Sequence, residues 1–481
     1  MSRRQSYDAV IVGAGPNGLA AAIVFAQTGR SVLVLEAQHT IGGGARSAEL
    51  TLPGFIHDPC SAVHPMAVAT PFFRSLPLAQ HGLRWIEPPA CMAHPFDDGP
   101  PAVLRTSIDA TGATLGADAV AYDRLVRPFV DQWEALSADA LAPVHIPRHP
   151  VLLGRFGLSA LRSASALAES RFRGKQGRGL FAGLAAHSIM PLTHAATASI
   201  GLVLGIVAHR TGWPIPAGGS QRIADALASY LRSLGGEIET DAPVTSIRDI
   251  PSAKSILLDV SPRGALAIAG DRFSTSYRRA LESFKSGSGV CKVDWALSGP
   301  VPWRDRACAE AGTLHLGNTL DEIATSEDAP FHGRHAEKPF VLAAQPSLFD
   351  PTRAPAGSHT FWGYCHVPNG SDVDMSDRIE RQIERFAPGF RDCILQRRVT
   401  RASEMHVDNA NLWGGDIGAG ENSLRQLFFR PAVRRVPYAT SVKGLYLCSA
   451  STPPGAGVHG LCGMFAARAA LAAERKDVRQ R

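Results

Sequence analysis

The segment DAVIVGAGPNGLAAAIVFAQTGRSVLVLE, residues 8–36, constrains the fold more than any other part of the 481-residue chain. It contains a short apolar run, a glycine-rich turn, an Ala-rich stretch and a second apolar run that ends in an acid. These patterns predict a strand, a tight turn, a helix and a second strand. That order is the beginning of a Rossmann-like parallel sheet.

Each glycine of the first turn has a separate physical role. Gly13 makes the tight turn, Gly15 lets the main chain approach a pyrophosphate, and Gly18 permits close packing of the helix on the strand. The first N–H groups of the helix then face phosphates with the positive end of the helix dipole. Glu36 ends the second strand, where a carboxylate accepts hydrogen bonds from ribose hydroxyls. The pattern predicts a dinucleotide site made of Gly13, Gly15, Pro16, Asn17, Gly18, Glu36 and Ala37.

A second glycine-rich turn follows at once in EAQHTIGGGARS, residues 36–47. The run resembles the extended fingerprint of the superfamily of FAD-dependent amine oxidases and phytoene desaturases, in which an acid precedes a GG-x-x-[ST] turn. The resemblance implies FAD as the cofactor, with its diphosphate and ribityl chain along Gly43, Gly44, Arg46 and Ser47. A glycine turn with one guanidinium also suits a ligand with two phosphates. A plain surface turn with a solvated Arg is the alternative.

The last apolar segment, LYLCSASTPPGAGVHGLCGMFAARAAL (residues 445–471), resembles the second FAD motif of the same superfamily. As in that motif, a strand, a Pro/Gly loop and a small-residue helix follow one another. The departure is Cys448-Ser449-Ala450, where the family often has a glycine and an acid. The resemblance implies a glycine floor under the flavin ring (Gly455, Gly457, Gly460 and Gly463) and a helix N-terminus that stabilises the reduced ring. The cofactor residues expected here are Ser449, Ala450, Gly457, Val458, His459, Gly460 and Leu461.

Two long stretches without a nucleotide signal interrupt these motifs. Residues 216–247 predict a turn, an amphipathic helix and a strand carrying Val244 and Ile247, and the resemblance places the backbone near Val244 against the adenine. Residues 255–262 predict a further strand. We therefore expect an α/β fold: a Rossmann-like FAD-binding domain (glutathione reductase-type) from residues 1–75, 215–288 and 400–481, with an interleaved α+β substrate-binding domain from residues 76–214 and 289–399.

The second interruption contains GVCKVDWALSGPVPW, residues 289–303, which alternates like a strand. It resembles the strand of flavin amine oxidases that carries a Lys near the isoalloxazine and a Trp ten or eleven residues later. The resemblance makes Lys292 a candidate catalytic residue that holds a water at flavin N5. A strand Lys that reaches solvent or pairs with Asp294 is the structural alternative.

Four further side chains are candidates for the site. His64 and His459 are the histidines expected nearest the flavin, and His459 is the second catalytic candidate. Residues 358–368 predict another strand, in which Trp362 and Tyr364 would form walls of a substrate pocket. Large apolar side chains are more often core than substrate contacts.

Composition excludes several function classes. Lys and Arg exceed Asp and Glu by 49 to 43 without a basic cluster that interleaves aromatics, so no nucleic-acid partner is expected. The eight cysteines are dispersed without metal-ligand spacing, so we expect no metal site and reduced thiols in a cytoplasmic protein. No signal peptide is recognised, and the apolar run at residues 195–208 is too short to span a bilayer.

Residues 148–178 interleave arginines with leucines and hold a single acid, Glu169. They predict a basic amphipathic helix, which would allow peripheral contact with an anionic membrane surface. A solvated helix face packed on its own domain is the alternative. The nearly uncharged region 189–208 favours a hydrophobic substrate.

The resemblance implies an FAD-dependent oxidoreductase, a dehydrogenase or desaturase that transfers a hydride from a hydrophobic, isoprenoid or lipid-like substrate to flavin N5. The spacing is closest to phytoene desaturase-like and pyridine nucleotide-disulfide oxidoreductase domain-containing proteins. One alternative is a flavin amine oxidase, which would need Lys292 and an aromatic cage. The other is a non-catalytic prenyl- or lipid-binding protein of the GDP-dissociation-inhibitor type, which the intact glycines and Glu36 disfavour.

Overall fold

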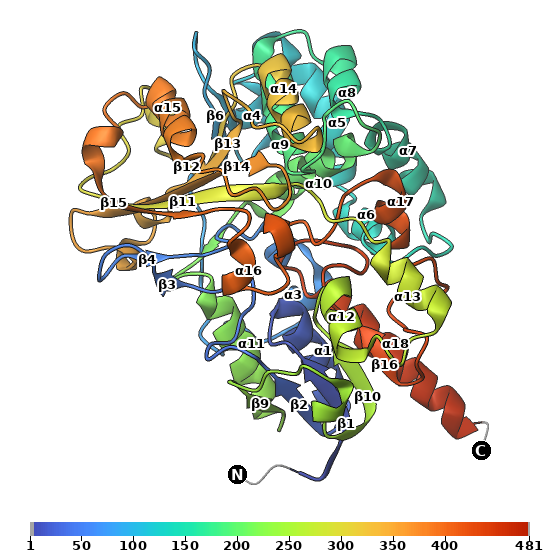
Figure 1. Cartoon of the computed structure of the whole chain (residues 1–481). Coiled ribbons are helices and arrows are strands. Elements are labelled where there is room, and N and C mark those ends of the chain that lie inside the picture. The colour runs from blue at the N-terminus through green and yellow to red at the C-terminus, as the bar shows by residue number, and fades with distance from the viewer. Residues whose placement is uncertain (1–3, 480–481) are drawn as a thin grey trace.

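A five-stranded parallel sheet carries the glycine-rich turns in this computed structural model, which describes residues 4–479 (Figure 1). The strand order is β16-β10-β1-β2-β9, and every neighbouring pair is parallel. The strands are β1 (Ser6–Val12), β2 (Val32–Leu35), β9 (Glu237–Glu239), β10 (Ser252–Leu258) and β16 (Leu445–Leu447). Because the carboxyl ends of parallel strands share one edge, the first and last glycine-rich loops lie at the same edge of this sheet.

Helices cover both faces of the parallel sheet, which explains why β2 and the carboxyl-terminal halves of β1 and β10 are apolar on both sides. Ile11, Val34 and Leu257 pack against one helical layer, and Val12 and Leu258 pack against the other. The first layer consists of α1 (Pro16–Ala26), α11 (Gln221–Ser233) and α18 (Leu461–Arg479), and the second of α12 (Pro262–Ala269) and α13 (Thr275–Glu282).

A seven-stranded mixed sheet forms the other half of the molecule, with the order β15-β11-β14-β13-β12-β6-β7. Its strands are β6 (Ala90–His94), β7 (Ala102–Leu104), β11 (Gly289–Leu297), β12 (Ala311–Leu316), β13 (Val341–Ala344), β14 (His359–Val367) and β15 (Ile394–Thr400). Cys291, Val293 and Trp295 of β11 belong to one core with α15 (Ser376–Phe386). Since side chains alternate along a strand, Lys292 and Asp294 point to the opposite face.

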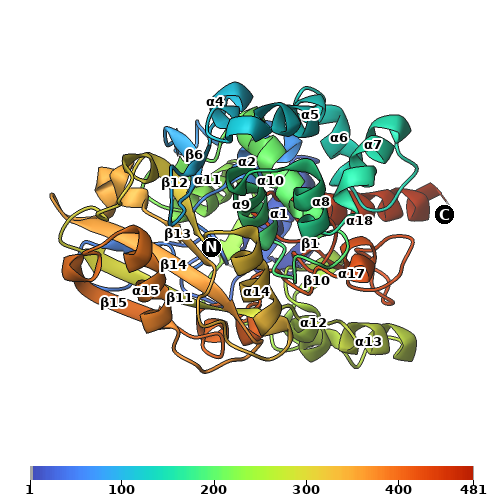
Figure 2. The ribbon, with the colours of Figure 1, turned by 90° about the horizontal axis from the view of Figure 1, so that it is seen from above.

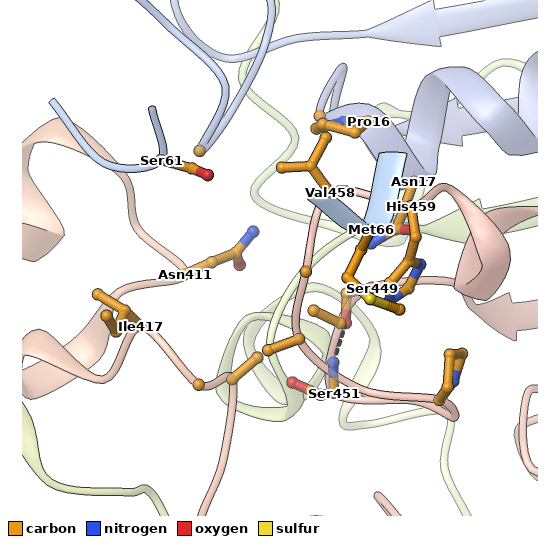
Figure 3. A pocket seen from close by; sticks show the side chains of 18 of the residues that line it. Pro16, Asn17, Ser61, Met66, Asn411, Ile417, Ser449, Ser451, Val458 and His459 are labelled. Carbon is orange, nitrogen blue, oxygen red and sulfur yellow. Dashed lines mark hydrogen bonds between the residues drawn. The ribbon is translucent and has the colours of Figure 1, made fainter. Parts of the chain in front are cut away.

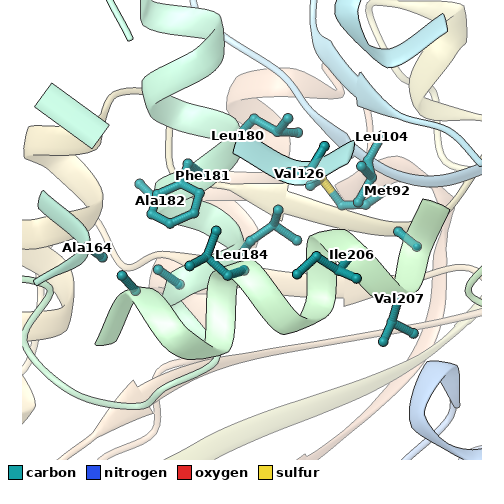
Figure 4. Packing of buried hydrophobic residues seen from close by; sticks show 14 of the residues in the cluster. Met92, Leu104, Val126, Ala164, Leu180, Phe181, Ala182, Leu184, Ile206 and Val207 are labelled. Carbon is teal, nitrogen blue, oxygen red and sulfur yellow. The ribbon is translucent and has the colours of Figure 1, made fainter. Parts of the chain in front are cut away.

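A helical layer covers that opposite face near β6, β7 and β13 (Figure 2). Its helices are α4 (Ile108–Gly112), α5 (Ala119–Val130), α6 (Trp133–Ala140), α7 (Pro150–Ala160), α8 (Ala164–Arg171), α9 (Lys175–Ala186), α10 (Thr197–Thr211) and α14 (Leu320–Phe331). Figure 4 shows the apolar core where α9 and α10 meet, with Leu180, Leu184 and Ile206 inside it. Within residues 4–479, no helix is long and apolar enough to cross a membrane.

Two expected elements differ in the structure. Val244 and Ile247 do not belong to a strand, because the chain leaves the sheet after β9 and turns at Asp241 with a positive φ of 53°. Residues 148–178 form parts of three helices rather than one. Ser163 caps α8 by accepting a hydrogen bond from the amide of Ala166, and Gly174 precedes α9.

The other expected strands are present as β10, β11 and β14, although β10 ends at Leu258 and Pro262 already begins α12. The parallel sheet draws on residues 6–35, 237–258 and 445–447, and the mixed sheet on 90–104 and 289–400. The domain boundaries themselves stay a prediction.

Candidate active site

A cavity of about 1600 Å³ extends from the carboxyl edge of the parallel sheet to β13 and β14 of the mixed sheet. Figure 3 shows the part around the two glycine-rich loops: Pro16 and Asn17 at the start of α1 face Val458 and His459 of the C-terminal loop. Ser61, Asn411 and Ile417 line the space beside them. The fold therefore brings together segments about 440 residues apart in the sequence.

At the glycines of the two N-terminal turns, no side chain separates the main chain from the cavity. Gly13 has a φ of +102°, which favours glycine. A Cβ on Gly18 would lie 2.0 Å from the Gly13 carbonyl oxygen, and a Cβ on Gly43 would lie 3.1 Å from Gly15 Cα. The turns are therefore packed against each other, and the start of α1 lies at the cavity wall, where a helix N-terminus favours an anion such as a diphosphate.

Glu36 is positioned by two main-chain donors. Its Oε2 accepts a hydrogen bond from the amide of Ala14 at 2.8 Å, and its Oε1 accepts one from the amide of Gln38 at 2.9 Å. The side chain is buried and lines the cavity. Because each carboxylate oxygen has a second acceptor site, Glu36 can still accept hydrogen bonds from two ribose hydroxyls. These residues fit the AMP half of FAD.

Arg46 and Ser47 of the second turn have different places. The Arg46 guanidinium lines the cavity and donates to the carbonyl oxygens of Gly43, at 3.0 Å, and Asp408. Ser47 lies outside the wall, where its hydroxyl donates to Asp58 at 2.6 Å and accepts from the amide of Gln221. Ser47 therefore joins the turn to α11.

The glycines of the C-terminal loop do not all form a floor. Gly457 lines the cavity with a φ of +123°. A Cβ on Gly460 would lie 2.7 Å from the Phe72 ring, and a Cβ on Gly463 would lie 1.8 Å from the Asn17 carbonyl oxygen. Gly460 and Gly463 let α18, which begins at Leu461, pack closely on its neighbours and do not line the cavity, and their role under a flavin ring stays a prediction.

His459 lines the cavity with both ring nitrogens occupied. Nδ1 accepts a hydrogen bond from the amide of Leu461 at 3.0 Å, and Nε2 lies 3.2 Å from the Gly455 carbonyl oxygen, to which it donates. Burial lowers the pKa of His459 to about 4, so the ring is neutral at physiological pH. These contacts hold the loop in shape, and a catalytic role for His459 stays a prediction.

Lys292 is buried, but it is not one of the residues that line the cavity. Its Nζ forms an ion pair with Asp294, and His57 Nδ1 lies 3.7 Å from the same carboxylate oxygen. Trp303, the tryptophan of the amine oxidase pattern, donates to Gln345 and also lies outside the wall. Of the two structural alternatives for Lys292, solvent contact or pairing with Asp294, the structure has the pairing. A catalytic role for Lys292 stays a prediction.

The far end of the cavity is formed by β12 and β14. Trp362 and Tyr364 line it with parallel rings, whose centroids are 5.9 Å apart. The Trp362 indole N–H and the Thr313 hydroxyl are buried there without a hydrogen-bond partner. His64 also lines the cavity; it bonds to Ser220 at 2.8 Å, and burial lowers its pKa to about 4.

The structure thus brings most of the predicted residues to one cavity. The wall includes Gly13, Gly15, Pro16, Asn17, Glu36, Ala37, Gly43, Gly44, Arg46, His64, Val244, Trp362, Tyr364, Ser449, Ala450, Gly457, Val458 and His459. Gly18, Ser47, Lys292, Gly460 and Leu461 lie outside it.

Sequence reasoning missed many wall residues, among them His187, Asp259, Thr313 and Asn411. Asp259 had a usable signal, because it directly follows β10 at the carboxyl edge of the parallel sheet, where ligands bind. The other three stand in no recognisable local pattern. Within residues 4–479, no group of three His, Cys, Asp or Glu side chains is arranged to hold a metal.

Comparison with known proteins assigns the family. The family described as FAD dependent oxidoreductase (DAO) matches residues 8–268, more than half of the chain. The chain belongs to this family. It is an enzyme, an FAD-dependent oxidoreductase, and the glycine turns and Glu36 described above fit its cofactor.

The individual relatives of this FAD-dependent oxidoreductase have names that refer to different kinds of oxidoreductase. Pyridine nucleotide-disulfide oxidoreductase domain-containing protein 2 of Rattus norvegicus is 27% identical over 96% of this chain and 93% of its own length. The neurosporene-forming phytoene desaturase of Rhodobacter capsulatus is 28% identical over 51% of each chain. A solved structure of putrescine oxidase bound to putrescine is similar with a TM-score of 0.62, at 16% identity over 98% of this chain and 99% of the oxidase, which shows the shared fold.

Proposed function

We propose that this oxidoreductase is a dehydrogenase that removes a hydride from a hydrophobic substrate bearing an oxygen atom. The observation that supports this proposal is the apolar branch of the cavity, which leads away from the glycine turns. Its walls come from α7 and α10, through Leu153, Phe156, Leu161, Ile200 and Val203. When bound, FAD supplies the hydride acceptor, flavin N5.

The apolar walls would bind a long hydrocarbon chain by burial, at about 25 cal/mol per Å² of apolar surface removed from water. They also exclude water from the reacting carbon. The phytoene desaturase relative has a hydrocarbon substrate according to its name, and an extended apolar branch supports a substrate of similar length and polarity here.

The Trp362 indole N–H and the Thr313 hydroxyl have no hydrogen-bond partner. These two buried donors support the proposal that the substrate carries an oxygen atom. A pure hydrocarbon would leave both donors unpaired beside it, at a cost of about 1–3 kcal/mol each. A hydroxyl or carbonyl oxygen would accept from the indole N–H. His187 lies at the same end; its Nε2 is 3.1 Å from His315 Nε2, so one of the two rings donates to the other.

The parallel rings of Trp362 and Tyr364 favour a second candidate, a flavin amine oxidase, because two aromatic faces can enclose an amine. Lys292 lies over the Trp362 ring, however, with its Nζ 5.5 Å from the ring centroid. Its charge is paired with Asp294 and its side chain lies outside the cavity wall, so the lysine that an amine oxidase would need does not reach the cavity. This geometry makes the amine oxidase the weaker candidate.

We also propose that the apolar branch opens toward a membrane surface. Leu158 of α7 and Phe428 of α17 (Leu424–Phe429) both line the cavity and are both exposed, so the cavity reaches solvent between these helices. Figure 1 shows α7 and α17 on the same side of the molecule. Further exposed apolar residues belong to the same two stretches of chain, 144–161 and 424–433: Val144, Ile146, Val151, Leu161, Leu424, Phe429 and Val433.

Exposed arginines stand among these apolar side chains, at Arg148, Arg155, Arg425 and Arg435. Apolar side chains that enter the headgroup region, together with cationic groups, suit an anionic bilayer. A substrate dissolved in that bilayer would reach the cavity without crossing water. The helices α7 and α17 thus take the place of the single amphipathic helix expected from the sequence.

Anaerobic mixing of the FAD-loaded enzyme with decane, decanol, decanone and decylamine tests the proposed reaction. We expect decanol to bleach the flavin absorbance and decane and decylamine to leave it unchanged. Bleaching by the amine with none by the alcohol would make the amine oxidase the correct assignment. If decane, which has no oxygen atom, bleached the flavin as fast as decanol, the proposal of an oxygen-bearing substrate would be wrong.

A further inference from the structure

Asp259 occupies the anion-binding end of α1. Its Oδ2 accepts a hydrogen bond from the amide of Gly18 at 2.8 Å. The same oxygen lies 2.9 Å from the position that a Cβ on Gly15 would take. The side chain is buried and lines the cavity beside the glycine turn. An acid therefore stands beside the glycine turn and the helix N-terminus that fit a diphosphate, and an ionised carboxylate at this position would repel that anion.

The surroundings of Asp259 offer little to offset a negative charge. Glu36 at the end of β2 faces it as a second carboxyl group, and the thiols of Cys448 after β16 and Cys462 on α18 also interact with it. Within residues 4–479, no Lys, Arg or His side chain forms an ion pair with Asp259. The amide of Gly18 is the favourable partner on α1.

Burial raises the pKa of Asp259 to about 7, and the negative charge of the Glu36 carboxylate acts in the same direction. The hydrogen bond from the Gly18 amide opposes this increase only in part. A proton is thus available on this carboxyl group near neutral pH. The neutral acid keeps Oδ2 as the acceptor for Gly18 and leaves a hydroxyl on Oδ1.

We propose that Asp259 is a cofactor-binding residue that acts as a neutral acid, donating its carboxyl proton in a hydrogen bond to a diphosphate oxygen of FAD. The Gly18 amide holds one oxygen of the carboxyl group, and the other oxygen carries the donated proton. The ionised side chain has no donor and would face the diphosphate with the same sign of charge. FAD binding and protonation of Asp259 are then linked.

The direction of this linkage follows from the charges. The bound diphosphate favours the neutral acid, so the pKa of Asp259 is higher with FAD than without it. Between these two values, binding takes up a proton and the affinity for FAD falls about tenfold for each pH unit. Below the lower value, the side chain is protonated in both states and the affinity is independent of pH.

Titration of the FAD-free protein with FAD, followed by quenching of flavin fluorescence from about pH 6 to about pH 8.5, tests this proposal. For the wild type, we expect a constant Kd at the acidic end and an increase of about tenfold per pH unit above neutrality. Asp259→Asn keeps a donor and cannot ionise, so its Kd should stay constant across the range. Asp408→Asn is the matched control, because it removes another cavity carboxylate that accepts from Arg398 and not from the turn at residues 13–18, and it should keep the wild-type slope.

Calorimetric titration in buffers of different ionisation enthalpy provides a second readout that needs no variant. We expect net uptake of up to one proton per FAD in the pH range where the Kd changes, and none for Asp259→Asn. A wild-type Kd that does not change with pH, or an equal slope in Asp259→Asn, would overturn the proposal. Zero proton uptake by the wild type in that range would overturn it even if the variant did not fold.

Discussion

Lys292 Nζ lies 5.5 Å from the centroid of the Trp362 ring, within the range of a cation–π contact. The two residues stand on neighbouring strands, where Lys292 pairs with Tyr364 and Asp294 pairs with Trp362 in the antiparallel register. The aromatic wall of the cavity therefore has a buried ion pair as its direct neighbour. A change in either charge alters the electrostatic potential at that wall.

Lys292→Met should slow flavin reduction or reoxidation while FAD stays bound, and it should also lower stability. It leaves Asp294, whose pKa burial already raises, as an unpaired buried acid. Removing one partner of a buried ion pair costs about 3–5 kcal/mol. Stopped-flow absorbance of the flavin measures the two rates, and thermal unfolding measures the stability.

The double variant Lys292→Met/Asp294→Asn separates the two roles of the lysine. It removes both charges, so stability should return toward the wild-type value. If the rates stay low, the lysine acts on the flavin. If they recover together with stability, Lys292 has only a structural role and the resemblance to amine oxidases at this strand is misleading.

Glu36→Ala should weaken FAD binding about 10- to 100-fold, because hydrogen bonds to a charged group contribute about 1.5–3 kcal/mol. The variant also leaves the amides of Ala14 and Gln38 without their acceptor. Glu36→Gln is the control: its amide oxygen can still accept one of these hydrogen bonds, so its loss should be smaller. Retention of FAD through gel filtration at the wild-type level in Glu36→Ala would contradict the ribose role.

Gly463→Ala should destabilise the protein even without FAD. The added Cβ would lie 1.8 Å from the Asn17 carbonyl oxygen, which belongs to the backbone of α1 and cannot move alone. We expect a loss of about 1–3 kcal/mol or more from this overpacking, seen in thermal unfolding of the FAD-free protein. Gly299→Ala is the matched control, since nothing lies within 4 Å of its added Cβ. Equal unfolding temperatures for both variants would mean that α1 and α18 are not closely packed.

Gly463 also shows what the sequence could and could not predict. The glycine spacing at Gly13, Gly15 and Gly18 predicted the parallel sheet and the cofactor end of the cavity, because each position has a known local role. The C-terminal loop is equally rich in glycine, yet two of its glycines, Gly460 and Gly463, serve helix packing. Their role depends on Asn17 and Phe72, which lie several hundred residues away in the chain.

The polar end of the cavity was beyond prediction for a similar reason. Trp362 and Tyr364 were expected as wall residues because they are large aromatic side chains in a predicted strand of the substrate-binding domain. Thr313 comes from β12, and His187 directly follows α9. Only the tertiary arrangement places these side chains together, so no local pattern in the sequence marks them.

Leu158→Glu should weaken binding to anionic vesicles. The wild type is expected to sediment with phosphatidylglycerol vesicles and much less with phosphatidylcholine vesicles, since arginines surround the exposed apolar side chains. Raising the salt concentration should reduce binding. Leu395→Glu is the control, because Leu395 is also exposed but belongs to β15 of the mixed sheet. Equal sedimentation of the two variants would place the membrane contact elsewhere or exclude it.

Trp362→Phe should weaken the binding of decanol without weakening that of decane. Phenylalanine keeps an aromatic wall but removes the indole N–H, which has no partner within the protein. The loss of one hydrogen bond corresponds to about 0.5–1.5 kcal/mol, or up to about tenfold in Kd. Perturbation of the flavin absorbance measures both dissociation constants. Trp303→Phe removes the indole N–H of a half-buried tryptophan outside the cavity wall and should change neither value. A similar loss of affinity for decane and decanol in Trp362→Phe would mean that the ring contributes packing alone, and that the cavity does not select an oxygen-bearing substrate through this residue.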